Sequence, residues 1–343
     1  MKIAVVGAGS LGTIIGGLIT QAGYNVDLID INKENIEGLN QHGAQISGHL
    51  NTVIPVSAKH YDDLESKYDT VFLLTKQVFT EAALSSISPF LHEESVVCTL
   101  QNGVPEEKVA SIVGSDRTVG GCVGFGATWK GPGKSELATK WETVKKYAFD
   151  IGELNGEISE RLITIKKILD TIGDCEMSTN ILGVKWSKLL MNATFSGMSA
   201  SLNCTFGDVL NNEDAMKSLA NIADETIKVA RANNIQLEKI QGKDMEFLEL
   251  ENQESILEKM EFYHEVWGPH ANTKASMLQD LEKNIKTEID FINGYVVKKG
   301  SEQNLSTPFN DLVCELVKKS EMTKDLPIFD QNIEEFQTLN NKM

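Results

Sequence analysis

The sequence predicts an α/β protein in two parts, with a mostly parallel sheet flanked by helices in the N-terminal half and an all-α C-terminal half. Short apolar runs with strand character alternate with helical periodicities through the N-terminal half. This alternation is typical of a parallel sheet that helices cover on both faces. From about residue 181 the apolar spacing becomes helical and strand signals become few, which predicts a purely helical second part.

The chain has 343 residues, long enough for two domains that each bury a core. We expect the boundary after residue 178, because Ser178, Thr179 and Asn180 offer capping chemistry to the helix that follows. The predicted domains therefore span residues 1–178 and 179–343. Strand candidates near residues 147–151 are interpreted as the far, partly antiparallel edge of the first domain's sheet.

The composition excludes several classes of protein. Hydrophobic residues make up 41% and charged residues 24% of the chain, as in ordinary globular proteins. A net charge of −17 leaves no basic stripe for nucleic acid and disfavours anionic membranes. No apolar stretch approaches the roughly 18 residues of a membrane span, and no secretory signal is recognisable. Five widely spaced cysteines without a C-x-x-C pair indicate buried thiols, no metal site and a cytoplasmic location.

An apolar strand at the very start of the chain leads directly into a glycine motif. The pattern G-x-G-x-x-G falls on Gly7, Gly9 and Gly12 and opens a helical run. In a Rossmann dinucleotide-binding domain these glycines allow the tight turn, the approach of a pyrophosphate and close helix packing. Ser10 and Leu11 then lie at the helix N-terminus that faces the anion. Glycine-rich turns also occur for backbone reasons alone, so the surrounding βαβ pattern carries the assignment.

An acidic residue ends the second predicted strand. Asp30 lies about 20 residues after the glycine motif, where a carboxylate accepts hydrogen bonds from ribose hydroxyls. By itself Asp30 is better explained as a turn residue helped by Asn32, but after the glycine motif the ribose role is favoured. A carboxylate there also repels a 2′-phosphate, so we expect NAD(H). Lys33 follows closely and keeps NADP(H) as an alternative.

Polar residues follow two further predicted strands. Lys76 comes after the strand at residues 70–74, and Gln101-Asn102-Gly103 comes after the strand at residues 95–100. Each alone is explained by a surface lysine or a plain turn. Because ligands bind beyond the carboxyl ends of such strands, both together predict contacts of Lys76 and Asn102 with cofactor and substrate.

A polar stripe marks the first helix of the second part. Asn192, Ser196 and Ser199 fall within about a quarter turn of Lys188 on a helix rich in large apolar residues. Burial of an unpaired ammonium is costly, so a lysine aligned with amides and hydroxyls predicts a cleft. A lysine that extends to solvent at the helix edge is an equal alternative.

Two more candidates lie between residues 276 and 294. Ser276 and Gln279 fit a capping box, which alone would explain the serine. Glu288 lies beside an apolar stripe that we expect to face the core, formed by Leu281, Ile285, Ile289, Ile292 and Val296. A carboxylate there is either a solvated edge residue or the partner of a lysine.

The ordered set of these motifs resembles the ketopantoate reductase family over nearly the whole chain. The resemblance implies a Rossmann domain and a helical domain like that of 6-phosphogluconate dehydrogenase, with the active site between them. It implies Lys188 as the catalytic lysine, Glu288 as the active-site carboxylate, and Asn102, Asn192 and Ser276 as substrate-binding residues. It also suggests a homodimer. The motifs are Gly7 to Gly12, Lys76, Gln101-Asn102-Gly103, Gly131-Pro132-Gly133, Lys188-x-x-x-Asn192, Ser276-Met277-x-Gln279-Asp280, Thr287-Glu288-Ile289-Asp290, Ile292-Asn293-Gly294 and Thr307-Pro308-x-Asn310.

Two positions depart from the family pattern. Asp30 stands where these reductases usually place a basic group for NADPH, and Ser196 stands where their lysine helix often carries a second asparagine. Family members that make D-2-hydroxy acids from other 2-oxo acids with NADH are therefore an alternative to a 2-dehydropantoate reductase. Asp30 favours them.

The resulting hypothesis is hydride transfer from NADH to C2 of a 2-oxo acid, with Lys188 protonating the oxygen. A non-catalytic NAD(H) sensor is the alternative from another class, but it has no need for Lys188 and Glu288. An opine-type dehydrogenase requires a histidine-centred site, for which only His264 and His270 are candidates. Their spacing does not fit a zinc site, and we interpret their segment as a loop that shapes substrate choice.

Overall fold

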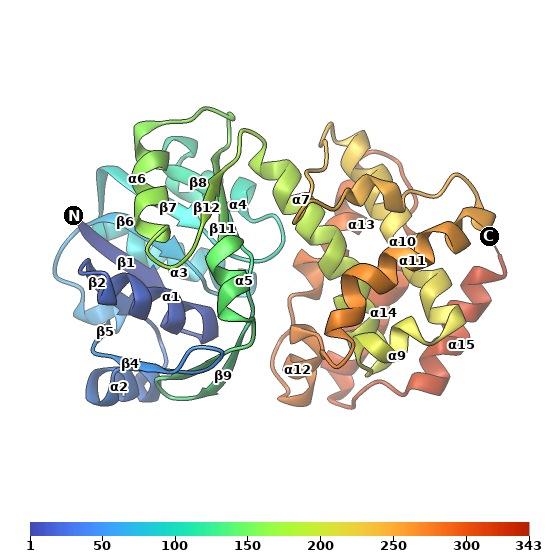
Figure 1. Ribbon diagram of the computed structural model, residues 1–343, viewed down its shortest axis with the longest axis horizontal. Coiled ribbons are helices and arrows are strands. Elements are labelled where there is room, and N and C mark those ends of the chain that lie inside the picture. The colour runs from blue at the N-terminus through green and yellow to red at the C-terminus, as the bar shows by residue number, and fades with distance from the viewer. Residues whose placement is uncertain (343) are drawn as a thin grey trace. The chain divides into compact units, whose positions relative to one another are not determined.

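The computed structural model describes residues 1–342, which divide into two compact units (Figure 1). Unit 1 comprises Met1–Leu182 and unit 2 begins at Gly183. The division falls in the first turn of helix α7 (Ile181–Met191), slightly beyond the boundary expected after Ser178. Ser178 accepts a hydrogen bond from the backbone N–H of Asn180 at 3.0 Å, so the predicted capping residues do shape the loop before α7.

Unit 1 contains an eight-stranded sheet, with the order β12-β11-β8-β7-β6-β1-β2-β5 among the described residues. Neighbouring strands are parallel except β11, which runs antiparallel to β8. The mostly parallel sheet and its antiparallel far edge are thus confirmed. The strands are β1 (Lys2–Val6), β2 (Asn25–Ile29), β5 (Ser57–Lys59), β6 (Tyr68–Leu73), β7 (Leu91–Thr99), β8 (Thr118–Val123), β11 (Phe149–Glu153) and β12 (Cys175–Met177).

Helices cover both faces of this sheet. Two separate apolar cores lie on its two sides, one containing Ile15 and Leu162 and the other Leu84 and Val109. These residues belong to α1 and α6 on one face and to α3 and α4 on the other. The helices of unit 1 are α1 (Ser10–Gln21), α2 (Lys33–His42), α3 (Thr80–Ile87), α4 (Glu106–Val113), α5 (Trp141–Lys146) and α6 (Glu160–Leu169).

Helix α1 lies between the main sheet and a second sheet that the pattern of apolar residues does not predict. A Cβ on Gly16 would lie 2.8 Å from Leu28 of the main sheet, and one on Gly17 would lie 3.1 Å from Ala44 of the second. Successive glycines therefore let both sheets approach one helix. The second sheet has the order β4-β3-β10-β9, with β3 (Ala44–Gly48), β4 (Thr52–Ile54), β9 (Ala127–Gly131) and β10 (Lys134–Leu137). Its strands are short and partly polar, which hides them in the sequence.

Unit 2 is helical, as predicted, and its described residues contain only one isolated β-bridge, between Ile240 and Lys243. The long helix α10 lies at its centre and packs against α13, α14 and α15. A π-helical turn, Asn192–Ser196, separates α7 from α8. The other helices are α8 (Gly197–Leu202), α9 (Phe206–Leu210), α10 (Glu213–Ala232), α11 (Ile256–Trp267), α12 (Ser276–Glu282), α13 (Asn293–Glu302), α14 (Pro308–Thr323) and α15 (Phe329–Asn340).

The apolar stripe predicted from Leu281 to Val296 is interrupted. Helix α12 ends at Glu282 and α13 begins at Asn293. Asn284 adopts a left-handed φ of 54°, which cannot continue an α-helix. Ile285, expected in the core, is therefore 45% exposed.

Two further observations bear on the class of protein. The five cysteines are buried free thiols. Within residues 1–342, no helix combines the length and the apolar character needed to cross a bilayer.

Candidate functional site

The glycine motif lies where the strand order of the main sheet reverses. Strand β1 pairs with β2 on one side and with β6 on the other, and open α/β sheets bind ligands at the carboxyl end of such a switch point. Gly7 follows β1 with a φ of 97°. A Cβ there would lie 2.7 Å from the backbone nitrogen of Thr75. Only glycine fits between β1 and the segment that follows β6.

Gly9 and Gly12 differ in what a side chain would meet. A Cβ on Gly12 would lie 2.0 Å from the Gly7 carbonyl oxygen, so the fold itself requires this glycine. A Cβ on Gly9 would meet no heavy atom of the described residues within 4 Å. The first turn of α1, which includes Ser10 and Leu11, carries no acidic side chain. Open space beside the positive end of a helix dipole fits a pyrophosphate, so these residues fit a bound dinucleotide.

Asp30 lies just beyond β2 and is half-buried. Its Oδ1 accepts a hydrogen bond from the backbone N–H of Asn32 at 3.0 Å, so the predicted turn role is present. Its Oδ2 accepts a hydrogen bond from the Asn35 side-chain amide at 3.2 Å. The charge of Asp30 also acts on Tyr61. Burial and, to a smaller extent, this charge raise the pKa of Tyr61 to about 12. The loop thus orients the carboxylate that we expect to contact the ribose.

Asn35, in the first turn of α2, connects Asp30 to the glycine turn. Its Nδ2 also donates to the carbonyl of Ala8 at 2.8 Å, and its Oδ1 accepts from the backbone N–H of Gly133 at 2.9 Å. The residue is 1% exposed. Asn35 is not among the residues predicted from the sequence. Its one local signal is the spacing from Asn32, whose side chain accepts the Asn35 backbone N–H.

Lys76 and Asn102 lie beyond the neighbouring strands β6 and β7 and are both half-buried. The Gln77 side chain donates to the Asn102 carbonyl at 2.5 Å. The Gln101 side chain donates to the Thr75 carbonyl at 2.8 Å. Thr75 also borders the glycine turn. Unit 1 therefore brings its predicted site residues together at the carboxyl ends of neighbouring strands of the main sheet.

Helix α7 and the π turn after it carry the predicted polar stripe. Lys188, Asn192 and Ser196 are each partly exposed, whereas Leu189 and Ala193 beside them are fully buried. The three polar residues therefore lie along one accessible line, which we call the polar line, and Met191 beside them is partly exposed as well.

Ser199, expected on the same stripe, lies in the core instead. Its hydroxyl donates to the Cys204 carbonyl at 2.6 Å and accepts the Ala275 backbone N–H at 3.2 Å. In the π turn the Gly197 N–H donates to the Asn192 carbonyl, five residues earlier. This wider turn winds less per residue, so later residues are rotated away from the line predicted for a regular α-helix. Turns of this kind are frequent at functional sites.

The capping-box explanation of Ser276 is wrong. The N-cap of α12 is Ala275, and Ser276 is the first helical residue. The Gln279 side chain donates to the Lys274 carbonyl at 3.2 Å instead of completing a box. Ser276 is exposed, so capping of α12 does not account for its hydroxyl.

Glu288 is half-buried in the loop before a 3₁₀ turn, Ile289–Phe291. Helix α14 holds this loop, because Glu321 accepts hydrogen bonds from the backbone N–H and the hydroxyl of Thr287, at 2.8 and 2.6 Å. Lys318 of the same helix forms an ion pair with Asp290 at 2.6 Å. The position of Glu288 is therefore set from α14.

The segment after Glu288 packs against the helix of Lys188. The rings of Trp186 in α7 and Tyr295 in α13 have centroids 5.7 Å apart. Asn293 donates to the Ala193 carbonyl in the π turn at 3.0 Å. Unit 2 thus connects the Glu288 segment to the polar line. Next to the exposed Ser276, Ala275 donates its backbone N–H to Ser199 of α8, and α12 also packs against α8 and the π turn.

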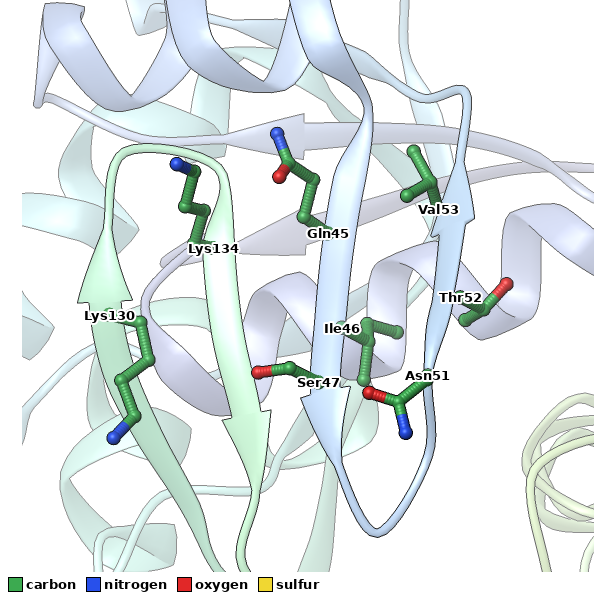
Figure 2. Close-up of a pocket in the computed structure, with 8 residues that line it drawn as sticks. All are labelled: Gln45, Ile46, Ser47, Asn51, Thr52, Val53, Lys130 and Lys134. Carbon is green, nitrogen blue, oxygen red and sulfur yellow. The ribbon is translucent and has the colours of Figure 1, made fainter.

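Other features fall outside this arrangement. A pocket of about 420 Å³ lies on the second sheet, where Ile46, Val53 and Lys134 line it (Figure 2). Lys130 at this pocket pairs with Glu136 at 2.7 Å. The predicted cofactor residues lie at the end of the main sheet and do not line it.

The two histidines considered from the sequence are both exposed. His264 belongs to α11 and His270 to a 3₁₀ turn, so their segment is helical and not the predicted loop. Across residues 1–342 no group of three or more His, Cys, Asp or Glu side chains is placed to hold a metal ion.

Two family models match the chain. The model described as "Ketopantoate reductase PanE/ApbA" matches residues 3–150, and "Ketopantoate reductase PanE/ApbA C terminal" matches residues 180–321. The first lies within unit 1. The second covers α7 and most of unit 2.

Similar individual proteins span almost the whole chain. The 2-dehydropantoate 2-reductase of Pyrococcus horikoshii is 31% identical over 324 residues, covering 94% of this chain and 98% of the relative. The enzyme of the same name from Lactococcus lactis is 27% identical over 332 residues, with coverage of 94% and 98%. A ternary structure of D-mandelate dehydrogenase with NADH and anilino(oxo)acetate has a TM-score of 0.81 and 25% identity, covering 94% of this chain and 99% of that chain.

Proposed function

Because the chain belongs to the ketopantoate reductase family, we propose that this oxidoreductase reduces a 2-oxo acid to the D-2-hydroxy acid, with Lys188 as general acid. The observation that carries the proposal is the accessible line of Lys188, Asn192 and Ser196 on a helix whose other residues are mostly buried. An amine, an amide and a hydroxyl on one face suit an anionic substrate that bears a carbonyl. A protein that only senses NAD(H) has no need for this line.

The proposed roles follow from the chemistry of each side chain. A bound nicotinamide supplies the hydride. Lys188 holds the proton that the carbonyl oxygen takes up as it becomes an alkoxide, and Glu288 orients the ammonium. Amides and hydroxyls hold the carboxylate and the carbonyl oxygen of the substrate. The residues proposed to do so are Asn102, Asn192, Ser196 and Ser276.

We propose NAD(H) as the preferred cofactor. Asp30 is oriented by Asn32 and Asn35, and its negative charge disfavours a 2′-phosphate. Lys33 is exposed at the start of α2 and is followed by Glu34, so it is a weak phosphate site. The D-mandelate dehydrogenase that resembles this chain binds NADH. NADP(H) is the alternative.

The first candidate substrate is 2-dehydropantoate, because relatives that match nearly the whole chain carry the name 2-dehydropantoate 2-reductase. Branched and aromatic 2-oxo acids are the second, because Asp30 departs from the NADPH pattern and the chain resembles D-mandelate dehydrogenase. We also propose a cytoplasmic homodimer; light scattering on the purified protein measures its mass directly.

A substrate panel tests the proposal. Oxidation of NADH and of NADPH is followed at 340 nm with 2-dehydropantoate and with branched and aromatic 2-oxo acids. We expect turnover with at least one of them, faster with NADH. NADH binding without any turnover would favour the sensor instead.

Lys188→Ala tests the general acid. Such a group is typically worth about 10²- to 10⁴-fold in rate, so kcat should fall by this factor. The affinity for NADH should stay within about twofold, since the predicted cofactor residues lie in unit 1. Lys217→Ala is the matched control, because this lysine lies on the outside of α10 and pairs only at the surface, with Glu213 at 2.8 Å. Unchanged turnover in Lys188→Ala, or an equal loss in the control, contradicts the assignment.

A further inference from the structure

A chain of buried polar side chains in unit 2 leads from α10 to the π turn. It consists of Glu225 on α10, Asn310 on α14 and Asn293 on α13, and we call it the buried amide chain. Glu225 is 9% exposed, and the two asparagines are fully buried. Buried polar groups are costly unless they are hydrogen-bonded, so the contacts of this chain need an explanation.

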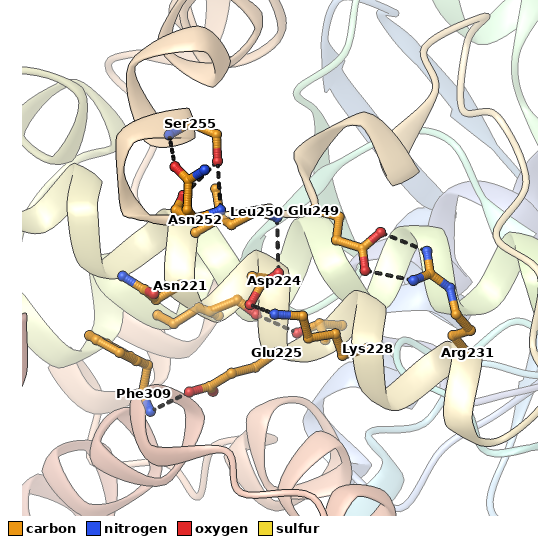
Figure 3. A network of polar contacts seen from close by, with 12 residues as sticks. Asn221, Asp224, Glu225, Lys228, Arg231, Glu249, Leu250, Asn252, Ser255 and Phe309 are labelled. Atoms are coloured by element: carbon orange, nitrogen blue, oxygen red, sulfur yellow. Dashed lines mark hydrogen bonds and ion pairs between the residues drawn. The ribbon is translucent and has the colours of Figure 1, made fainter. Parts of the chain in front are cut away.

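The buried amide chain starts at a carboxyl group that accepts hydrogen bonds from the N-terminus of a helix. Glu225 Oε1 accepts the backbone N–H of Phe309 at 2.9 Å, a contact drawn in Figure 3. Its Oε2 accepts the backbone N–H of Asn310 at 3.0 Å and the Asn310 side-chain amide at 2.7 Å. The neighbouring Asp224 faces another segment, since its carboxylate accepts the Leu250 N–H at 2.9 Å (Figure 3).

The carboxyl of Glu225 sets the direction of the hydrogen bonds between the side chains of the buried amide chain. Both oxygens of Glu225 accept hydrogen bonds, so Asn310 turns its NH₂ toward Glu225 and its carbonyl oxygen toward Asn293. Asn293 in turn must donate, and its Nδ2 lies 2.9 Å from Asn310 Oδ1. The same NH₂ group donates to the Ala193 carbonyl at 3.0 Å. The orientation of Asn293 is thus set from two sides, by the Ala193 carbonyl and, through Asn310, by Glu225.

The chain ends in the π turn, where the backbone needs outside partners. The Thr194 hydroxyl donates to the carbonyls of Leu190 and Met191, at 2.8 and 3.0 Å. Ala193 receives its side-chain donor from Asn293, 100 residues away in sequence. Asn192 of the polar line directly precedes Ala193, and Ser196 follows it three residues later at the end of the π turn.

The lack of a side chain at Gly197 leaves room for the Asn293 amide. A Cβ at position 197 would lie 2.9 Å from Asn293 Oδ1 and 3.1 Å from its Nδ2. Oδ1 is buried and has no hydrogen-bond partner within the described part of the chain. An arrangement chosen for stability alone would satisfy this acceptor. The packing instead favours one orientation of the NH₂ group.

We propose that Asn293, oriented through Asn310 by Glu225, is a positioning residue that fixes the π turn and thereby places Asn192 and Ser196 for the 2-oxo acid. This inference rests on the proposed function, in which these two side chains bind substrate. Asn293 acts through the backbone of Ala193 and does not touch the substrate.

Two variants interrupt the chain in different ways. Asn310→Leu keeps the branched shape of the side chain but neither donates nor accepts, so Glu225 and Asn293 lose their connection. Gly197→Ala introduces a better helix former whose Cβ displaces the Asn293 amide. In both variants kcat/KM for the 2-oxo acid should fall about 10- to 100-fold, as small displacements remote from the chemistry can cause. The KM for NADH should stay at the parent value.

Asn332→Ala is the matched control. Asn332 is a buried amide on α15 that donates to the carbonyl of Ser201 in α8 at 2.7 Å. Like Asn293, it donates its side-chain amide to a backbone carbonyl. This carbonyl lies in α8, beyond the polar line. Its variant should lose stability and keep the parent kinetics. Parent kinetics in both Asn310→Leu and Gly197→Ala, or an equal kinetic loss in Asn332→Ala, would overturn the proposal.

Amide hydrogen exchange separates this proposal from the proposed function. The peptide that covers residues 190–198 should exchange faster in Gly197→Ala than in the parent protein, while peptides of unit 1 stay unchanged. If the parent reduces no 2-oxo acid, the proposed function fails. The role of the buried amide chain is then tested by amide hydrogen exchange alone. Parent-like protection of this peptide would overturn that role. If Asn310→Leu does not fold, Gly197→Ala decides by both measurements.

Discussion

The buried carboxyl of Glu225 makes the stability of the protein depend on pH. Burial, the largest influence, raises the pKa of Glu225 from an ordinary 4.5 to about 7, against the hydrogen bonds from Phe309 and Asn310 that lower it; the charge of Asp311 adds a smaller increase. In the unfolded chain this carboxyl titrates near its ordinary value. Between these two pH values the native state therefore binds a proton that the unfolded state does not.

The proton stabilises the native state at low pH, and its contribution is lost as pH rises through 7. Folding increases the proton affinity of this carboxyl about 300-fold, which corresponds to about 3 kcal/mol in total. About 2.5 kcal/mol of this falls between pH 5 and pH 8. Asp27 and Glu153 affect the pH dependence of stability in the opposite direction, because folding lowers their pKa values.

Glu225→Gln isolates the effect, because glutamine does not titrate. The free energy of unfolding is measured by urea denaturation of parent and variant at pH 5, 6, 7 and 8. The parent should lose about 2.5 kcal/mol relative to the variant from pH 5 to pH 8, while the contributions of other carboxyls cancel in the difference. A difference that stays constant within about 0.5 kcal/mol refutes the reasoning.

Three further predictions concern unit 1. Gly9→Ala should keep the parent melting temperature, because its Cβ meets no described atom within 4 Å. It should weaken NADH binding about tenfold. A fluorescence titration that gives the parent affinity for NADH would contradict the pyrophosphate site. Asp30→Ala should raise the ratio of kcat/KM for NADPH over NADH about tenfold, and an unchanged ratio in steady-state assays would contradict the ribose role. Asp27→Asn should lower the free energy of unfolding by about 3 kcal/mol, because Asp27 accepts hydrogen bonds from Ser57 and Tyr68 at 2.8 and 2.9 Å and pairs with two lysines. Denaturation showing less than about 1 kcal/mol of loss would contradict that account.

The sequence by itself determined the fold class, because the period of the apolar residues and the chemistry of the turns are local properties. The glycine motif is readable for the same reason. Gly7 and Gly12 are required by contacts with backbone a few positions away or at the neighbouring strand, and a parallel sheet places such strands predictably. The line of Lys188, Asn192 and Ser196 follows from helix period alone.

The local sequence pattern predicts the wrong environment where the backbone departs from a regular element. Ser199 left the polar line because of the π turn, Ser276 does not cap its helix, and Ile285 lies exposed in a break between helices. The short strands of the second sheet were missed, because their apolar pattern is too brief to distinguish from loop.

Only the tertiary structure decided which distant polar groups meet. Asn35 joins Asp30 to the glycine turn, and Asn293 contacts Ala193 across 100 residues of sequence. A buried asparagine has no period and no fixed spacing from its partner, since hydrogen bonds between packed helices depend on how the helices are brought together. The residues of the candidate site could therefore be named from the sequence, but the contacts that orient them could not.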